Sequence, residues 1–270
     1  MIYGFSQHKK GVVGIYRKVI YDMGVIRQIE KSFPANYGAP GEKREKKQKR
    51  TPEDVRRQNE RNRWKRVQRI ILANFHEGDW HLVLKYTKGT NPEDYKEAKK
   101  HLKKFIEKMR AAYKKAGLPF KWIAVTERGK KGKILHHHLI IEDIEEDGIR
   151  TADLVKRIWR HGGQFFSSLY ENGEYEQLAE YIVKSETKEE CGWCTYSRSR
   201  NLIVPQAKVE IVRRRKWKNP PVAPKGWYVV KDSIWNGINP VTGYPVQHYT
   251  LKKLINTKGR GKGGGSRTCT

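Results

Sequence analysis

The chain has 270 residues, enough for one large domain or for a core domain with flanking extensions. Its 57 Lys and Arg residues against 29 Asp and Glu residues give a formal net charge of +28 and a pI near 10. This excess predicts a polyanionic partner, either nucleic acid or an anionic membrane surface. No apolar run approaches the roughly 18 residues of a spanning helix, and residues 1–30 lack a signal-peptide core. The 14 Tyr and 8 Trp residues suit unstacked bases, so we favour nucleic acid and expect no membrane partner.

Three cysteines, an odd number, argue against a disulfide framework and for a reducing compartment. Cys191-Gly-Trp-Cys194 is a single CxxC pair, and a structural zinc site would need a second pair. Cys269 lies in a Gly-rich stretch and is a poor fourth ligand. We interpret the cysteines as incidental thiols.

Basic segments flank the centre of the chain. Residues 1–74 are predicted to form a basic N-terminal extension, in which Thr51-Pro52 begins an Arg-rich helix. Residues 191–258 form a basic, aromatic C-terminal extension, and residues 259–270 a disordered tail. The candidate DNA contacts in the two extensions are Arg56, Arg57, Arg63, Arg66, Arg213, Arg214, Arg215 and Trp217. Alanine replacement of either cluster is expected to weaken origin binding without abolishing cleavage of saturating substrate.

Residues 75–190 alternate strand and helix patterns. The predicted strands are Trp80–Tyr86, Lys121–Glu127, Ile134–Glu142 and Gln164–Tyr170. The predicted helices run from the cap at Asn91–Asp94 to Gly117, from Thr151 to Trp159 and over Glu174–Glu186. This order predicts an α+β fold with a central, mainly antiparallel sheet and flanking helices. The strand Ile134–Glu142 is the most apolar and should lie at the centre.

Three consecutive histidines enter that central strand. Side chains alternate along a strand, so His136 and His138 share one face and His137 takes the other. Two imidazoles on one face of a stiff element can share a divalent metal ion. Glu127 ends the preceding strand, and the turn between the strands can bring its carboxylate close. A half-buried strand with structural histidines accounts for the same residues, so the histidines alone leave both interpretations open.

Three motifs follow one another in the central region. Leu82-Val83-Leu84-Lys85-Tyr86 is an aromatic-ended strand, His136-His137-His138 lies on a second strand, and Tyr181-Ile182-Val183-Lys184 lies on a helix. In this order they resemble the HUH endonucleases, specifically rolling-circle replication initiators of the single-tyrosine type found in small phages and plasmids of bacteria. The resemblance covers about 115 residues. It departs from the family at His137, where a bulky hydrophobe is usual.

The resemblance implies a ferredoxin-like HUH fold that nicks and joins single-stranded DNA at a replication origin. Tyr181 would attack the phosphorus and leave a 5′-phosphotyrosine and a free 3′-hydroxyl. Lys184 would lower the pKa of Tyr181 or neutralise phosphate charge. His136, His138 and Glu127 would hold Mn²⁺ or Mg²⁺, although the histidines would also tolerate zinc, cobalt or nickel. Tyr86 would contact DNA.

The partners that the resemblance implies are origin DNA, a host polymerase and, because no Gly-x-x-x-x-Gly-Lys-Ser/Thr motif is present, a host helicase, all in the cytoplasm of a bacterial cell. Ser185 stands where a second helical tyrosine would lie, so strand closure would draw on a second protomer in a homo-oligomer.

Other assignments remain open from sequence. Tyr170, Tyr175 and Tyr196 compete with Tyr181 as nucleophile, and further site candidates are Asp79, His81 and Glu142. A non-catalytic protein that binds single-stranded nucleic acid explains the charge and the aromatics equally well. His136-x-His138-x-x-x-Glu142 is also close to the first metal motif of the cupins, which are all-β enzymes. The predicted helices count against a cupin.

Overall fold

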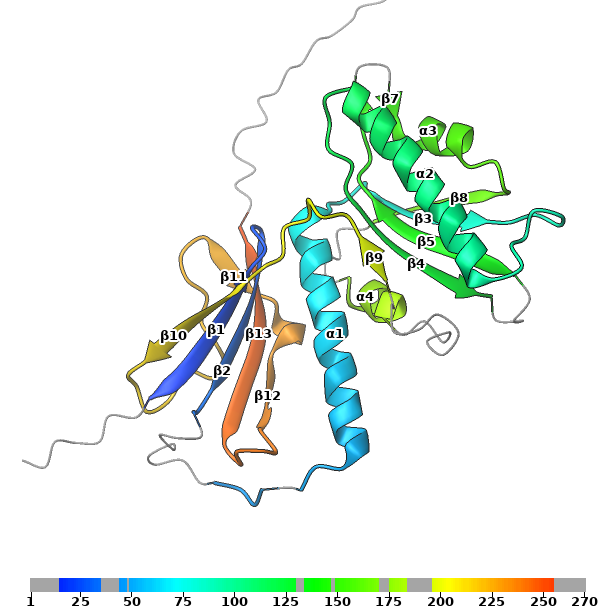
Figure 1. The fold of residues 1–270 in the computed structure, drawn as a ribbon. Helices are drawn as coiled ribbons and strands as arrows, with labels where there is room; N and C mark the ends of the chain where they lie inside the picture. The colour runs from blue at the N-terminus through cyan, green and yellow to red at the C-terminus, as the bar shows by residue number, and fades with distance from the viewer. Residues whose placement is uncertain are drawn as a thin grey trace, which may run out of the picture. The chain divides into compact units, whose positions relative to one another are not determined.

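The computed structural model describes residues 15–34, 44–47, 49–129, 134–146, 149–169, 175–183 and 196–254. It divides the chain into two compact units, drawn in Figure 1. The central unit is Arg50–Pro205, and the terminal unit joins Met1–Lys49 to Gln206–Thr270. The sequence divisions after residues 74 and 190 therefore differ from the structural ones, and the Arg-rich helix belongs to the central unit. The functional roles given to the extensions stay predictions.

The central unit has the predicted α+β architecture, with antiparallel strands and flanking helices. Its elements are α1 (Pro52–Asn74), β3 (Trp80–Lys85), α2 (Tyr95–Lys115), β4 (Trp122–Arg128), β5 (Leu135–Ile141), β6 (Glu145–Glu146), β7 (Ile149–Arg150), α3 (Thr151–Ile158), β8 (Gln164–Ser168), α4 (Glu176–Val183) and β9 (Ser197–Arg198). The main sheet has the order β8-β3-β5-β4-β9, and each neighbouring pair is antiparallel. The histidine strand β5 lies at the centre of this sheet, as its apolar sequence predicts.

Local signals fix the two long helices. Thr51 and Asp54 form a capping box at the start of α1, in which each side chain bonds the other residue's backbone N–H. Helix α2 begins at Tyr95, because the Asp94 side chain accepts a hydrogen bond from the Glu97 N–H and caps the helix there. Pro92 and Glu93 therefore precede the helix.

Each face of the central sheet is covered by a different pair of helices. On the α2 face, helices α2 and α3 pack on Leu82, Leu84 and Leu139. On the α4 face, helices α1 and α4 pack on Ile123 and Ile140. A shift of strand register by one residue would exchange these two sets of side chains between the faces, so the two cores together fix the register.

The terminal unit is an antiparallel sheet that the sequence analysis did not predict. Its strands are β1 (Tyr16–Asp22), β2 (Ile26–Ser32), β10 (Ala207–Val212), β11 (Trp227–Val229), β12 (Trp235–Ile238) and β13 (Pro245–Lys253), with the short 3₁₀ helix η1 (Lys231–Ser233). The order is β10-β1-β2-β13-β11, and β12 also pairs with β13. Strands from both ends of the chain thus form one sheet. In the described ranges, no helix is both long and apolar enough to cross a bilayer.

Candidate metal centre and nucleophile

The histidine strand presents its three imidazoles to two different environments. Strand β5 runs between β3 and β4, so both of its edges are hydrogen-bonded and its side chains are fixed to one face or the other. His136 and His138 lie on the α4 face. His137 points to the α2 face and is 0% exposed. The alternation predicted from the sequence is what the structure shows.

Glu127 joins the two histidines through the register of β4 and β5. Glu127 lies directly opposite His136 in the antiparallel pair. Its Oε1 atom is 2.9 Å from His136 Nε2 and 3.2 Å from His138 Nε2. One ligand atom from each of the three side chains lies within 4.8 Å of the other two. These residues therefore form a group, called the donor group below, that could hold a metal ion.

The donor group fits a divalent metal ion. Two imidazole nitrogens suit zinc, nickel or iron, and a carboxylate oxygen suits magnesium or manganese, so the mixed set does not select one metal. Three protein donors are also fewer than a closed structural site needs, which leaves positions for other oxygen ligands. Glu142, the alternative carboxylate, instead pairs with Lys121 at 3.2 Å.

Tyr181 reaches the donor group from helix α4. Ala179, Ile182 and Val183 are buried and anchor the helix on the sheet. Tyr181 remains 39% exposed and directs its hydroxyl to the donors. The hydroxyl oxygen is 2.8 Å from His138 Nε2, and the hydroxyl donates a hydrogen bond to Glu127 Oε1. A solvent-accessible phenol thus lies beside two of the three donors.

Burial and hydrogen bonding set opposite pKa shifts in this pair. Burial and the bond to the Glu127 carboxylate raise the pKa of the Tyr181 hydroxyl above its ordinary value. Burial alone would raise the pKa of Glu127 too, but hydrogen bonds from His136, His138 and Tyr181 outweigh it and hold that pKa well below its usual range. Glu127 is therefore an anion at neutral pH, and Tyr181 is a neutral phenol.

His81 on β3 is part of the same cluster, although sequence reasoning ranked it low. Its Nε2 atom is 3.1 Å from His138 Nδ1, and the two rings stack with centroids 5.3 Å apart. Burial, with a smaller effect of His138, lowers the pKa of His81 to about 4, so its imidazole is neutral. His81 holds the ring nitrogen of His138 that faces away from Glu127. The register of β3 on β5 creates this contact, and periodicity along β3 alone could not reveal it.

The opposite face of β5 holds a different network. His137 Nε2 is 2.8 Å from the Tyr86 hydroxyl, and its Nδ1 is 2.8 Å from the Thr126 hydroxyl. Burial lowers the pKa of His137 to about 3, with smaller effects of the neighbouring histidines. Tyr86 is only 5% exposed and packs edge-on against Trp159. The prediction that Tyr86 contacts DNA finds no support, because its ring and hydroxyl are occupied in the core.

The remaining predicted residues fall in three places. Lys184, together with Tyr170 and the two cysteines of the CxxC pair, lies outside the described residues. The exposed cations of α1 include Arg56, Arg57, Arg63 and Arg66, of which Arg57 pairs with Glu53 at 2.7 Å. In the terminal unit, the side chains of Arg213, Arg214 and Arg215 are exposed.

Three predicted aromatic residues have packing roles. Trp217 is half-buried and stacks on Phe33 with ring centroids 4.9 Å apart. Tyr175, a competitor for the nucleophile, has a positive φ of 39° and packs against the core under α4. Tyr196 packs against the same core. Among the described tyrosines of the central unit, only Tyr181 bonds the donor group.

Comparison with known proteins adds one finding. Residues 79–186 match a family model of replication-associated proteins, described as the ORF2 type. The matched segment contains β3, β4, β5 and α4, and with them every residue of the donor group and Tyr181. No curated protein and no solved structure matches the chain.

Proposed function

We propose that this protein initiates rolling-circle replication by nicking and rejoining single-stranded origin DNA through a 5′-phosphotyrosine on Tyr181. The observation that carries the proposal is the position of the Tyr181 hydroxyl, 2.8 Å from His138 Nε2 and hydrogen-bonded to Glu127. A nucleophile needs to lie beside the group that polarises its target. The match of residues 79–186 to a replication-associated family supports the same role.

The proposed reaction is a transesterification that conserves the phosphodiester bond energy. The Tyr181 oxygen bonds to the phosphorus as its proton leaves, and the bond from phosphorus to the 3′-oxygen breaks. The 3′-oxygen takes up a proton and leaves as a free hydroxyl, which a host polymerase extends after a host helicase has opened the duplex. Attack by a later 3′-hydroxyl on the phosphotyrosine reverses these steps and joins the strand.

The residues of the site divide this work. Glu127, His136 and His138 would hold Mn²⁺ or Mg²⁺. A bound cation would polarise a phosphate oxygen and remove the repulsion between the Glu127 carboxylate and a Tyr181 phenolate. Helix α4 keeps the Tyr181 oxygen beside the donors, and His81 holds the ring of His138. Lys184, three residues after Tyr181, keeps its proposed role of lowering the Tyr181 pKa or neutralising phosphate charge.

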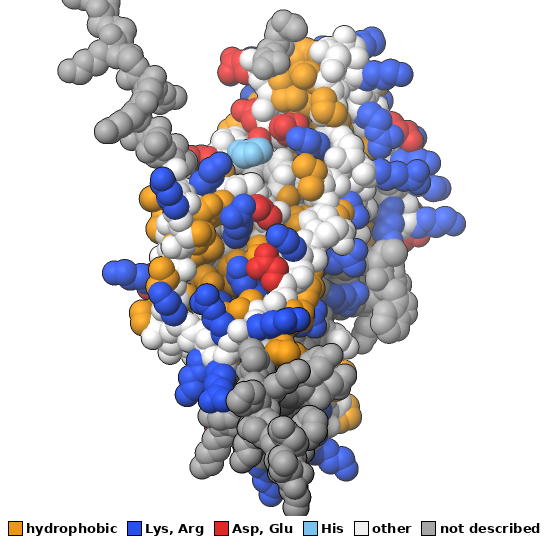
Figure 2. Space-filling view, turned by 90° about the vertical axis from the view of Figure 1, so that its left-hand side faces the viewer, with side chains coloured by type: hydrophobic (Ala, Val, Ile, Leu, Met, Phe, Trp, Pro, Cys, Tyr) orange, Lys and Arg blue, Asp and Glu red, His pale blue; other side chains and the backbone are white. Residues whose placement is uncertain are grey.

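The charge of the protein supports a nucleic-acid substrate. On the face drawn in Figure 2, blue Lys and Arg side chains are much more frequent than red Asp and Glu side chains. Helix α1 adds its exposed arginines to the central unit, which also carries the donor group. Phosphate contacts of this kind position a strand without reading its sequence. We assign α1, and Arg213–Arg215 of the terminal unit, to origin binding.

The alternative enzyme class is not compatible with the fold. Cupins are all-β proteins, whereas the central unit contains four described helices and an antiparallel sheet. Glu142, the carboxylate that the cupin motif requires, pairs with Lys121 rather than with the histidines. A protein that binds single-stranded nucleic acid without cutting it remains the alternative that an experiment must separate.

The decisive experiment is the capture of the covalent intermediate. Wild-type protein is incubated with Mn²⁺ and labelled single strands from the origin region of its replicon, and adducts are separated on denaturing gels. We expect a labelled protein band in the wild type and none in Tyr181→Phe, which keeps the ring but lacks the nucleophilic oxygen. Tyr175→Phe is the matched control and should form the adduct normally. Adduct formation by Tyr181→Phe would refute the assignment of the nucleophile, and binding without any adduct would favour the non-catalytic alternative.

A further inference from the structure

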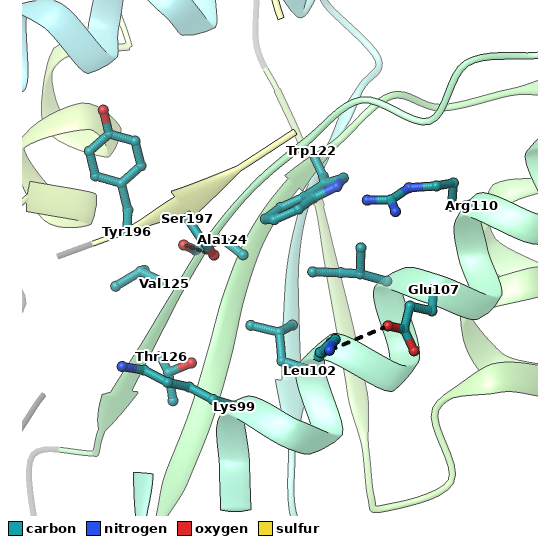
Figure 3. Close-up of a pocket in the computed structure, with 12 residues that line it drawn as sticks. Lys99, Leu102, Glu107, Arg110, Trp122, Ala124, Val125, Thr126, Tyr196 and Ser197 are labelled. Atoms are coloured by element: carbon teal, nitrogen blue, oxygen red, sulfur yellow. Dashed lines mark hydrogen bonds and ion pairs between the residues drawn. The ribbon is translucent and has the colours of Figure 1, made fainter. Parts of the chain in front are cut away.

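A second feature of the central unit lies on the other side of the sheet from the donor group. A groove of about 450 Å³ runs between helix α2 and the strands β4 and β9, shown in Figure 3. Leu102, Ile106 and Trp122 line it with apolar surface. This volume is in the range of pockets that hold ordered ligands.

The wall of the groove that α2 provides is basic. Lys99, Lys103 and Arg110 project from this helix and are exposed, and the one carboxylate of the lining, Glu107, pairs weakly with Lys103 at 3.9 Å. At 1.5 Å per residue, these cations extend over about 16 Å of the helix axis. The groove therefore presents a row of positive charge longer than one phosphate group needs.

Aromatic rings lie on the opposite wall. Trp122 of β4 and Tyr196 next to β9 both line the groove, and Figure 3 shows the Trp122 indole beside Arg110. The Trp122 Nε1 atom is buried and has no hydrogen-bond partner among the described residues. Cations along one side and aromatic rings along the other are the combination that single-stranded nucleic acids bind, with phosphates on the cations and bases against the rings.

The groove is continuous with the donor group through strand β4. Thr126 lines the groove, and the next residue, Glu127, turns to the other face and joins the donors. Arg128 follows, with its guanidinium 5.4 Å from the ring centroid of Tyr95 at the start of α2. Cationic side chains thus extend from the end of β4 along α2 into the groove.

We infer that the groove between α2 and β4 binds a segment of single-stranded DNA that flanks the phosphate held at Tyr181. The inference rests on the proposed function for the identity of the strand, but the binding itself needs no chemistry at Tyr181. The strand passes around the end of β4, where Glu127 and Arg128 lie on opposite faces. Lys99, Lys103 and Arg110 contact its phosphates.

Two charge-matched variants test this inference. Lys99→Glu with Lys103→Glu reverses two cations of the groove, and Lys100→Glu with Lys104→Glu reverses two exposed cations of the same helix that do not line it. Binding of fluorescent oligodeoxythymidylate is measured by anisotropy with EDTA present, so that cleavage plays no part. Circular dichroism checks that both variants keep their helices.

We expect the groove variant to bind about tenfold or more weakly than the control variant at moderate salt. The slope of log K against log salt should fall by about 1.4 in the groove variant alone, which is 0.7 for each of two lost phosphate contacts. Oligonucleotides with 5-iododeoxyuridine should also crosslink to the peptide that contains Trp122 or to the one that contains Tyr196. Equal losses in the two variants, or crosslinks confined to other peptides, would overturn the inference and leave the groove for another ligand, such as an extended peptide.

The results separate this inference from the proposed function. A wild-type protein that forms no adduct but loses binding only in the groove variant would retain the groove and lose the nuclease assignment. A wild-type protein that forms the Tyr181 adduct while both variants bind equally would retain the nuclease and lose the groove.

Discussion

The two faces of strand β5 place neighbouring histidines in opposite chemical roles. On the α4 face, His136 and His138 share a carboxylate and lie beside an exposed tyrosine. On the α2 face, His137 is fully buried, and neutral hydroxyl groups occupy both of its ring nitrogens. The carboxylate allows an imidazole to carry or share positive charge, whereas burial among aromatic rings keeps it neutral. The residue type alone therefore does not decide whether a histidine serves a metal or the core.

Removal of the α4-face imidazoles should have the largest effect. His136→Ala with His138→Ala deletes two of the three donors, so we expect the variant to lose detectable binding of Mn²⁺. In the wild type, Mn²⁺ at a hundred times its dissociation constant should stabilise the fold by about 2.7 kcal/mol, and this stabilisation should vanish in the variant. Titration calorimetry and thermal unfolding with and without Mn²⁺ measure the two effects.

The matched control is on the same strand. His137→Phe changes only the α2 face and should keep the Mn²⁺ affinity within a few-fold of the wild type. Loss of Mn²⁺ binding in this control, with its fold intact, would show that the two faces do not act separately.

The support of His138 by His81 should have an intermediate effect. A metal ion on His138 Nε2 requires the proton of that imidazole to be on Nδ1, where His81 Nε2 accepts it at 3.1 Å. His81→Phe removes the acceptor and should lower metal affinity by about 10- to 100-fold. His81→Asn keeps an acceptor oxygen and should recover part of the affinity. Mn²⁺ titration of the three proteins distinguishes this positioning role from a packing role, in which Phe would perform better than Asn.

The buried network should affect stability alone. Tyr86→Phe removes the hydroxyl that bonds His137 Nε2 and leaves that nitrogen without its partner inside the core. The free energy of unfolding should fall by about 1–3 kcal/mol, the usual cost of an unsatisfied buried polar group. Urea unfolding measures this change, and Mn²⁺ affinity should stay at the wild-type value. A variant with unchanged stability and weakened Mn²⁺ binding would contradict the separation of the faces.

Some of the site followed from sequence because it depends on local geometry. Strand alternation separated His137 from His136 and His138, since successive side chains point to opposite faces whatever the strand packs against. The Thr51 cap and the apolar stripe of α2 were also local, because a helix needs only its own neighbours to satisfy its first N–H groups and to define one face. The environment of Tyr86 was not local, because the same pattern describes a ring that faces DNA and a ring that faces a helix.

The terminal sheet shows where sequence reasoning fails. Strands β1 and β2 gave only weak signals, and the C-terminal segment appeared rich in turns. Yet Lys18 on β1 bonds Glu210 on β10, 192 residues away in the chain. The sheet joins strands from the two ends of the protein, and short strands have little stability without their partners.

The sequence by itself determined the α+β class, the pairing of His136 with His138 on one face and the basic character that demands a polyanion. Only the tertiary structure decided which groups meet those histidines. The register of β4 places Glu127 opposite His136, the register of β3 brings His81 to His138, and the packing of α4 brings the Tyr181 hydroxyl to the donors. Register and docking depend on side chains far apart in the chain, so no local pattern contains them.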